Sequence, residues 1–208
     1  GSVLMASTFD TSSPSDGLYI STDSGVNWTK VQPGGTVNNW WALASDSTGQ
    51  HLMAGAYGGR LYISNNYGID GSWTETHPAG PVNKSWFGAA SDSDGSNLIV
   101  GVDGGYIYTS SNYGADWTER RPAGDDIKQW FSLASDSTGA HLIAAAFNCC
   151  YNYTGHLYIS FDSGATWTEQ FPGGITNGYW RSVTCNSDGT RYAAGIAGGN
   201  LYIGTFSP

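Results

Sequence analysis

The sequence predicts an all-β protein made of repeated four-stranded antiparallel units, and three observations point to this fold class. The four residues Trp40, Trp86, Trp130 and Trp180 open similar segments and repeat every 44 to 50 residues. Each period holds short apolar runs separated by glycine-containing turns, a pattern typical of strands. No segment shows the periodicity of a helix. Periods of about this length are typical of propeller blades. We therefore expect a β-propeller of about five blades, with incomplete first and last blades.

The 208 residues suit a single domain, 1–208, because all-β domains of this length commonly form one closed architecture. The repeat units are roughly 3–39, 40–85, 86–129, 130–179 and 180–208. The first strand of a unit begins at its Trp, as in WWALAS from Trp40, and a polar turn such as Asp46 to Gly49 follows. The second strand is apolar throughout, as in LMAGA from Leu52, which fits a strand packed between neighbouring sheets.

The third strand and the turn after it form the most regular motif of the chain. The strand reads Leu/Ile-Tyr-Ile/Thr-Ser and occurs four times before the turn, and a fifth start, LYIG, begins at Leu201. In the turn, an Asp or Asn can accept backbone N–H groups, a Gly supplies a left-handed conformation and a Trp packs back over it. The motif residues are Ser21, Asp23, Gly25, Trp28, Ser64, Asn66, Gly68, Trp73, Ser110, Asn112, Gly114, Trp117, Ser160, Asp162, Gly164 and Trp167. The fourth strand, as in WTEQF from Trp167, leads to a Pro-Gly loop.

Ser-x-Asp-x-Gly-x-x-Trp resembles the Asp-box, the repeat of sialidases and of many other β-propellers. The resemblance implies a propeller fold and a structural role for these turns, on the side away from the ligand. The strand count gives units of three, four, four, four and three strands. Three arrangements follow for the ends: the ring closes by pairing the termini, stays open, or is completed by a second chain.

Composition excludes several classes of protein. The chain has 17 acidic and 8 basic residues, a net charge of −9, which disfavours nucleic acid and anionic membranes as partners. No apolar run approaches the ~20 residues of a membrane span. No leader is recognised at the N-terminus, and we expect an extracellular or cell-surface location. The three cysteines, Cys149, Cys150 and Cys185, form no metal pattern. Free thiols are expected, with a bridge to Cys185 as the alternative.

The sialidase resemblance makes an enzyme the first alternative to weigh. That family needs three converging arginines, a Tyr–Glu nucleophile pair and an Asp acid/base. Its N-terminal arginine motif is absent, and the five arginines are Arg60, Arg120, Arg121, Arg181 and Arg191. Glycosidases in general need two carboxylates across a cleft. The glutamates Glu75, Glu119 and Glu169 repeat in one column of the fourth strand, which indicates an architectural role. Asp103, Asp125 and Asp126 lie in variable loops, where solvated carboxylates are common. We predict no catalytic residue and no cofactor.

Metal sites are also weakly indicated. Asp92-x-Asp94-Gly95 and Asn186-x-Asp188-Gly189 resemble the opening of a calcium loop, but the remaining ligands are absent. The four histidines His51, His77, His141 and His156 are spread over different loops. Ordinary hairpin turns explain these residues better, and we predict no metal.

The candidate ligand-binding residues lie where the repeats differ, at the end that carries the loops after the second and fourth strands. Aromatic faces beside polar groups suit sugar rings. Alternatively, the Trp of each first strand packs between neighbouring blades. The candidates are Trp40, Trp86, Trp130, Trp180, Tyr57, Arg60, Asp103, Tyr106 and Arg181.

Two functions therefore remain for the chain. The first is a non-enzymatic binding module, with glycans or a protein as partner and sites repeated around the ring; an oligomer formed through the incomplete terminal blades is compatible with it. The second is a glycosidase-related propeller, or a fragment of one, that lacks a recognisable catalytic set. A purely structural scaffold is a third alternative. Similar residues in several blades favour the first, since an enzyme needs unlike residues that meet at one place.

Overall fold

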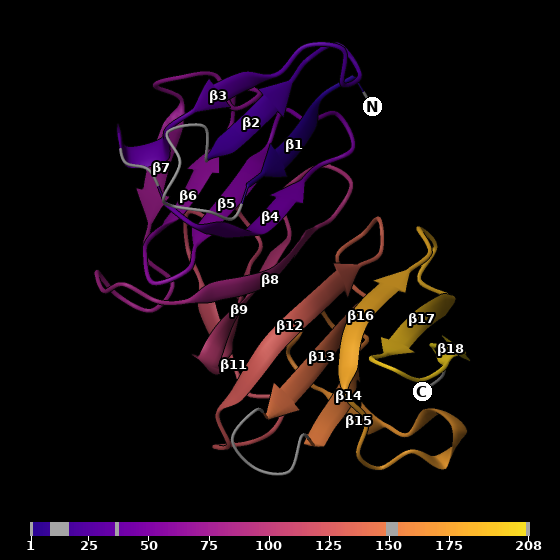
Figure 1. Cartoon of the computed structure of the whole chain (residues 1–208). Coiled ribbons are helices and arrows are strands. Elements are labelled where there is room, and N and C mark those ends of the chain that lie inside the picture. Colours follow the sequence, from indigo (N-terminus) through magenta and orange to yellow (C-terminus); the bar gives the residue numbers. More distant parts are fainter. Residues whose placement is uncertain (1, 9–16, 36–37, 149–153, 207–208) are drawn as a thin grey trace.

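The computed structural model describes residues 2–8, 17–35, 38–148 and 154–206, and β-strands dominate them (Figure 1). The first nine strands are β1 (Leu4–Ser7), β2 (Leu18–Ser21), β3 (Thr29–Val31), β4 (Trp40–Ser45), β5 (Leu52–Ala56), β6 (Leu61–Ser64), β7 (Trp73–Thr76), β8 (Trp86–Ser91) and β9 (Leu98–Gly105). The others are β10 (Ile107–Ser110), β11 (Thr118–Arg120), β12 (Lys128–Ser135), β13 (Leu142–Asn148), β14 (Thr154–Ser160), β15 (Thr168–Gln170), β16 (Trp180–Cys185), β17 (Arg191–Ile196) and β18 (Leu201–Thr205). Two short 3-10 turns, η1 (Pro33–Gly35) and η2 (Pro172–Gly174), lie in the loops.

Consecutive strands pair antiparallel and form five meanders in chain order. Meander 1 is β1–β3, meander 2 is β4–β7, meander 3 is β8–β11, meander 4 is β12–β15 and meander 5 is β16–β18. Meanders 3 and 4 share one continuous sheet because Lys128 and Gln129 of β12 pair with Gly105 and Asp103 of β9. The all-β, antiparallel prediction is confirmed. The strand β12 begins two residues before the expected Trp130, since this extra pairing extends it.

The meanders follow one another in an arc in which the first strands β4, β8, β12 and β16 lie side by side (Figure 1). The sheet of β1–β3 and the sheet of β16–β18 stand at separate ends of this arc. Among the described residues, no strand of one sheet pairs with a strand of the other. Of the three arrangements weighed for the ends, pairing of the termini within the chain is therefore not seen among the described strands.

The hydrophobic core lies between successive meanders. We call the face of a meander that packs on the following meander its forward face, and the face that packs on the preceding meander its rear face. In meander 3 the forward face presents Ile99 and Ile107, and both are buried. They pack against the rear face of meander 4, which presents Trp130, Leu142 and Tyr158. The same pairing of faces recurs between the other successive meanders. Each sheet is therefore apolar on both sides, as the second strands predict.

A glycine of the second strand lets the Trp of the next meander approach closely. A Cβ built on Gly55 would lie 2.6 Å from Cβ of Trp86. Gly101 faces Trp130 in the same way. Packing between meanders thus explains the glycines at these two positions.

A serine ladder, formed by Ser47, Ser93, Ser137 and Ser187, connects the turns after the first strands. The backbone N–H groups of Ser47, Ser93 and Ser137 each donate to the carbonyl of the next serine, at 3.0, 3.1 and 3.0 Å. Their hydroxyls donate to the same carbonyls at 2.7, 2.7 and 2.6 Å. Each serine pair therefore forms one rung of the ladder. The rung fixes the spacing of two neighbouring meanders at the ends of the strands where these turns lie.

The motif turn of meander 4 shows how the repeated Ser, Asp, Gly and Trp interact. The Ser160 hydroxyl accepts from Gly164 N at 2.9 Å and donates to Asp162 Oδ1 at 2.9 Å. Asp162 Oδ1 also accepts from Thr166 N at 2.7 Å. The indole Nε1 of Trp167 donates to Gly164 O at 3.0 Å. Gly164 has φ 84°, which a glycine adopts without strain.

Each of these turns also places a second residue in the left-handed region, immediately before the glycine. The four residues are Ser24, Tyr67, Tyr113 and Ser163, with φ between 54° and 61°. Two consecutive residues of positive φ turn the backbone sharply, so that the Ser hydroxyl can accept from the glycine N–H. The sequence predicts only the glycine, because Ser and Tyr are not residues that favour this conformation.

Removing the turn acceptor should lower stability modestly. Asp162→Ala is expected to cost about 1 kcal/mol of unfolding free energy, because Thr166 N loses its partner. Urea unfolding followed by tryptophan fluorescence measures this. Asp162→Asn is the matched control, since Asn112 fills the same position in meander 3 and its Oδ1 accepts Asp116 N at 2.9 Å. Equal losses in the two variants would show that the acceptor is not what stabilises the turn.

Candidate functional site

The site starts from a β-bulge that recurs in every first strand. In β4, Trp40 pairs with Ala56 and Ala42 with Gly55, so Trp41 has no opposite partner. The same shift follows Trp130 in β12 and Trp180 in β16, and one lies between Trp86 and Ala89 in β8. A bulge bends the strand and turns the extra side chain out of the regular alternation. The residues placed in this way are Trp41, Phe87, Phe131 and Arg181.

These four side chains, with Tyr57 and Tyr179 from the adjoining loops, form a continuous series that we call the aromatic row. The Phe87 ring lies 4.3 Å from that of Trp41 and 4.3 Å from that of Phe131, measured between centroids. Tyr57 extends the row at one end, 5.7 Å from Trp41. The row thus crosses meanders 2, 3, 4 and 5, one residue from each first strand.

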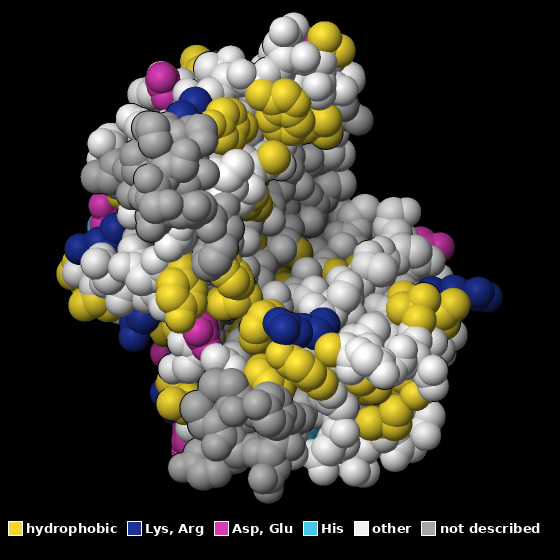
Figure 2. All heavy atoms as spheres, viewed as in Figure 1, with side chains coloured by type: hydrophobic (Ala, Val, Ile, Leu, Met, Phe, Trp, Pro, Cys, Tyr) yellow, Lys and Arg dark blue, Asp and Glu magenta, His cyan; other side chains and the backbone are white. Residues whose placement is uncertain are grey.

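Arg181 occupies the other end of the row, between two rings. Its guanidinium carbon lies 4.7 Å from the Phe131 centroid and 4.5 Å from the Tyr179 centroid. Tyr179 in turn stacks on Phe147 at 4.1 Å. A guanidinium held over ring faces in this way keeps its outward N–H donors available. Figure 2 shows hydrophobic side chains gathered around a basic side chain where the first strands converge.

The row is partly open to solvent. Tyr57 is 44% exposed and Arg181 is also exposed. Trp41, Phe87, Phe131 and Tyr179 are half-buried. The row is therefore a series of partly accessible ring edges and faces, with one exposed residue at each end. The sequence suggested Tyr57 and Arg181 but not the three bulge aromatics, because alternation alone does not say which neighbour of each Trp faces outward.

The four Trp residues at the strand starts do not form the exposed surface that was expected of them. Their exposed fractions are 2% for Trp40, 2% for Trp86, 0% for Trp130 and 1% for Trp180. Each packs edge-on against the Tyr of its own third strand, as Trp130 does on Tyr158 at 5.8 Å. A fully buried indole offers no face to a ligand. The four Trp residues instead pack between neighbouring meanders, which is the alternative role that the sequence allowed.

The remaining candidates are engaged elsewhere. Arg60 Nε lies 3.3 Å from Glu75 Oε1. Asp103 Oδ1 accepts from Gln129 Nε2 at 2.6 Å, across the β9–β12 pairing. Tyr106 lies beneath the guanidinium of Arg121, 4.5 Å from ring centroid to Cζ. We find no contact that joins these three residues to the aromatic row among those that the described residues make.

The column of glutamates is tied to the outer strands rather than to a cleft. Each glutamate lies opposite the Tyr of the neighbouring third strand, as Glu169 does opposite Tyr158. Burial, with the nearby charge of Glu169, raises the pKa of Tyr158 to about 12. Glu169 also contacts His156 Nδ1, and Arg121 binds Glu119 at 2.8 Å. These carboxylates have structural partners.

The turns after the first strands, two of which (at Asp92 and Asn186) resemble the opening of a calcium loop, are closed by hydrogen bonds within the protein. The buried Asp136 carboxylate accepts from His141 Nδ1 at 2.7 Å and from the Thr138 hydroxyl at 2.9 Å. Asp92 uses Asn97 instead, at 2.6 Å. Within the described ranges, no three His, Cys, Asp or Glu side chains gather as a metal site would require. The sequence did not show that an Asp and the side chain five residues later would pair.

Cys185 is a free thiol. Burial, together with the charge of Asp136, raises its pKa to about 11. Cys149 and Cys150 lie outside the described residues.

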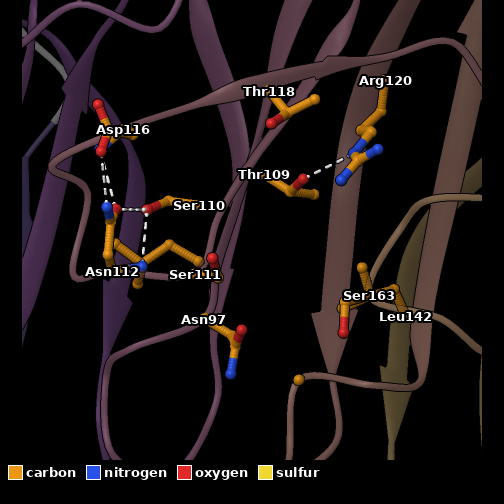
Figure 3. A pocket seen from close by; sticks show the side chains of 12 residues that line it. Asn97, Thr109, Ser110, Ser111, Asn112, Asp116, Thr118, Arg120, Leu142 and Ser163 are labelled. Atoms are coloured by element: carbon orange, nitrogen blue, oxygen red, sulfur yellow. Dashed lines mark hydrogen bonds between the residues drawn. The ribbon is translucent and has the colours of Figure 1, made fainter.

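Hollows lie between successive motif turns, at the opposite ends of the strands from the aromatic row. The one between meanders 3 and 4 is a cavity of about 270 Å³ lined by polar side chains that include Asn112, Arg120 and Ser163 (Figure 3). Arg120 Nε donates to Thr109 Oγ1 at 2.8 Å within it. A hollow of similar size, about 300 Å³, separates meanders 1 and 2, and a larger one of about 810 Å³ separates meanders 2 and 3. They carry no exposed aromatic row.

The sheets, their order and their packing are those of a β-propeller protein, and similar solved structures agree. A GH74 enzyme from Niastella koreensis matches with a TM-score of 0.71 at 20% identity over 97% of this chain and 34% of its own. A GH74 xyloglucanase from Xanthomonas campestris matches with a TM-score of 0.67 at 20% identity, over 98% and 34%. YCF48 bound to D1 peptide matches with a TM-score of 0.65 at 19% identity, over 92% and 58%.

These neighbours are β-propeller proteins. At such identities the likeness shows the fold alone, and this chain spans about a third of the GH74 chains. No family model matches the sequence, and no curated protein matches it. The described part of the chain contains no helix long and apolar enough to span a membrane.

Proposed function

We propose that the chain is a non-catalytic recognition propeller, with each meander as one blade, that binds carbohydrate over the aromatic row. The observation that carries the proposal is the half-exposed series from Tyr57 to Arg181, built by one bulge residue from each first strand. Sugar rings stack their C–H faces on aromatic side chains, while guanidinium N–H groups donate to hydroxyl oxygens. The row supplies both kinds of contact.

Several rings in a line favour a chain of sugars over a single one. The row runs across four meanders, so an extended oligosaccharide would touch successive rings. Each contact would be weak alone, and the contacts would add through their connection in one ligand. The likeness to a xyloglucanase, a protein named for a polysaccharide substrate, is compatible with this class of ligand.

A second candidate is a peptide ligand on the same surface. It is favoured by the apolar character of the row and by the likeness to YCF48, whose structure holds a D1 peptide. A glycosidase-related function has less support, because the glutamates and Asp103 are engaged with Arg60, Arg121, His156 and Gln129. A structural scaffold remains the alternative if neither ligand binds.

Titration calorimetry with xyloglucan and cello-oligosaccharides tests the proposal. Tyr57→Ala should weaken binding severalfold, because one stacked ring contributes about 0.5–1.5 kcal/mol beyond its area. Arg181→Ala should also weaken binding, because its guanidinium donors to the sugar hydroxyls are lost. Tyr113→Ala is the matched control, since Tyr113 is 41% exposed, close to the 44% of Tyr57, but lies in a motif turn. Its affinity should equal that of the wild type.

Two results would contradict the carbohydrate proposal. One is absence of binding to every oligosaccharide tested at millimolar concentration, with peptide binding as the follow-up. The other is binding that Tyr113→Ala weakens and Tyr57→Ala leaves unchanged, which would place the ligand among the motif turns.

A further inference from the structure

The cavity between meanders 3 and 4, which we call the polar cavity, contains an arginine at a position that is uncharged in the other meanders. Arg120 is the third residue after the motif Trp, and the same position is held by Val31, Thr76 and Gln170. Arg120 pairs with Ile107 of β10, which is buried against meander 4. Residues paired across two antiparallel strands lie on the same face. The Arg120 side chain therefore belongs to the forward face of meander 3.

A second change, at Thr109 of β10, accompanies the arginine. The third residue of the other third strands is isoleucine, at Ile20, Ile63, Ile159 and Ile203. The Thr109 methyl keeps the packing role of this position, because a Cβ built on Gly164 of the next motif turn would lie 3.0 Å from Thr109 Cγ2. The Thr109 hydroxyl meanwhile accepts from Arg120 Nε at 2.8 Å. The two changes fit each other, since the threonine holds the arginine in place.

The terminal nitrogens of Arg120 have no protein acceptor. Within the described ranges, the bond from Nε to Thr109 is the one hydrogen bond that its guanidinium makes, and no ion pair includes it. The neighbouring Arg121 binds two carboxylates, at 2.8 and 2.6 Å. In meander 2, Thr76 links to the next motif turn by accepting from Trp117 Nε1 at 2.8 Å. Arg120 makes no such link to meander 4, so tying the meanders together does not account for it.

Hydroxyl groups surround the arginine in the polar cavity. Ser111, Thr118 and Ser163 line it (Figure 3), and their hydroxyls make no hydrogen bond to another described residue. One carboxylate, that of Asp116, also lines the cavity and accepts from Asn112 Nδ2 at 2.8 Å. Figure 3 shows this pair on the other side of the view from Arg120. The part of the cavity around Arg120 therefore offers donors and a positive charge.

We infer that the polar cavity binds a small oxyanion through Nη1 and Nη2 of Arg120. These two nitrogens form a planar pair of donors that matches two oxygens of a carboxylate or a sulfate. Thr109 occupies Nε and so fixes the direction of the pair. The volume of about 270 Å³ is several times the ~30 Å³ that one water occupies, which leaves room for an ion of this size. The site lies at the opposite ends of the strands from the aromatic row and is separate from the proposed function.

Titration calorimetry and melting curves of the full chain with sodium acetate and with sodium sulfate test the inference. Sodium chloride keeps the ionic strength constant, so that general screening does not imitate binding. Binding should be saturable and should raise the melting temperature. Arg120→Thr, which places the residue of meander 2 at this position, should weaken binding by about tenfold or more, because the paired donors are lost. Arg121→Thr is the matched control and should bind like the wild type, since Arg121 is 48% exposed and already paired.

A double variant guards against loss of binding through misfolding. Thr109→Ile with Arg120→Val restores the pair that meander 1 carries at Ile20 and Val31, so it should fold and fail to bind either ion. Tyr57→Ala should bind both ions like the wild type, which separates this site from the aromatic row. Stronger binding of acetate would identify a planar carboxylate as the preferred ligand, and stronger binding of sulfate a tetrahedral ion. A wild-type protein that responds to neither ion beyond chloride would overturn the inference, as would binding that Arg120→Thr leaves unchanged.

Discussion

Trp130→Ala should lower the free energy of unfolding by about 3–5 kcal/mol, the cost of emptying a large buried site. Trp130 is 0% exposed and packs among Ile99, Ile107 and Leu133 between two sheets. Its Nε1 also donates to Gly105 O at 3.0 Å. Gly101 faces its Cβ from the preceding meander, so on that side no side chain is present to fill the space. Urea unfolding monitored by circular dichroism measures the loss.

Trp130→Phe is the control for this substitution. It keeps an aromatic ring in the site. It removes the hydrogen bond but only part of the side-chain volume, so it should lower the free energy of unfolding clearly less than alanine does. A Trp130→Ala protein of unchanged stability that no longer binds oligosaccharide would contradict the packing role. That outcome would instead mean that the Trp residues of the first strands contact the ligand.

Asp136→Ala should also be destabilising, by about 2 kcal/mol, because several donors that converge on this buried carboxylate lose their acceptor. The carboxylate holds the His141 ring, the Thr138 hydroxyl and Thr138 N. Its side chain is 2% exposed, so water does not replace it readily. The melting temperature and the urea midpoint give the loss. Asp126→Ala, at a carboxylate that is 78% exposed, should change stability little.

The same carboxylate makes stability depend on pH. Burial would raise the pKa of Asp136, but hydrogen bonds from His141, Thr138 and their backbone N–H groups outweigh it and lower the pKa overall. The folded protein therefore binds fewer protons here than the unfolded chain does. The stabilisation is present in full above the unfolded value of about 4 and is lost as pH falls through the lower folded value.

Urea midpoints measured from neutral pH down to about pH 2 check this dependence. Asp136→Asn removes the titrating group, so its curve should be flatter than that of the wild type in the acid range. A wild-type midpoint that does not fall with pH would contradict the assignment, as would a slope that Asp136→Asn leaves unchanged. Asp46, which pairs with His51 at 2.8 Å, should contribute in the same direction.

The strands were predictable from the sequence because local patterns specify them. The runs from Trp40, Trp86 and Trp180 begin β4, β8 and β16 at those residues, and the LYIS segments coincide with β2 and β6. Their alternation, apolar character and flanking turns are properties of the strand itself. The antiparallel order followed from the short connections between them.

The aromatic row could not be predicted in the same way. It depends on a bulge after each Trp, and no residue type marks a bulge at Trp41, Phe131 and Arg181 alike. The sequence left ligand contact and packing between blades open for the large Trp residues, and the structure buries them. It also gave no sign of the serine ladder, since Ser47 and Ser93 are ordinary turn residues whose partners lie one repeat away.

The serine ladder sets a rule for how such a chain can change in length. Every rung uses the same two donors and the same acceptor, so an inserted copy of a whole repeat would meet neighbours that already fit it. Duplication or loss of one unit therefore needs no new interface, whereas a partial unit breaks a rung. All donors point toward the later repeat. The array consequently has a fixed polarity, and it can grow only by copies joined in the same sense.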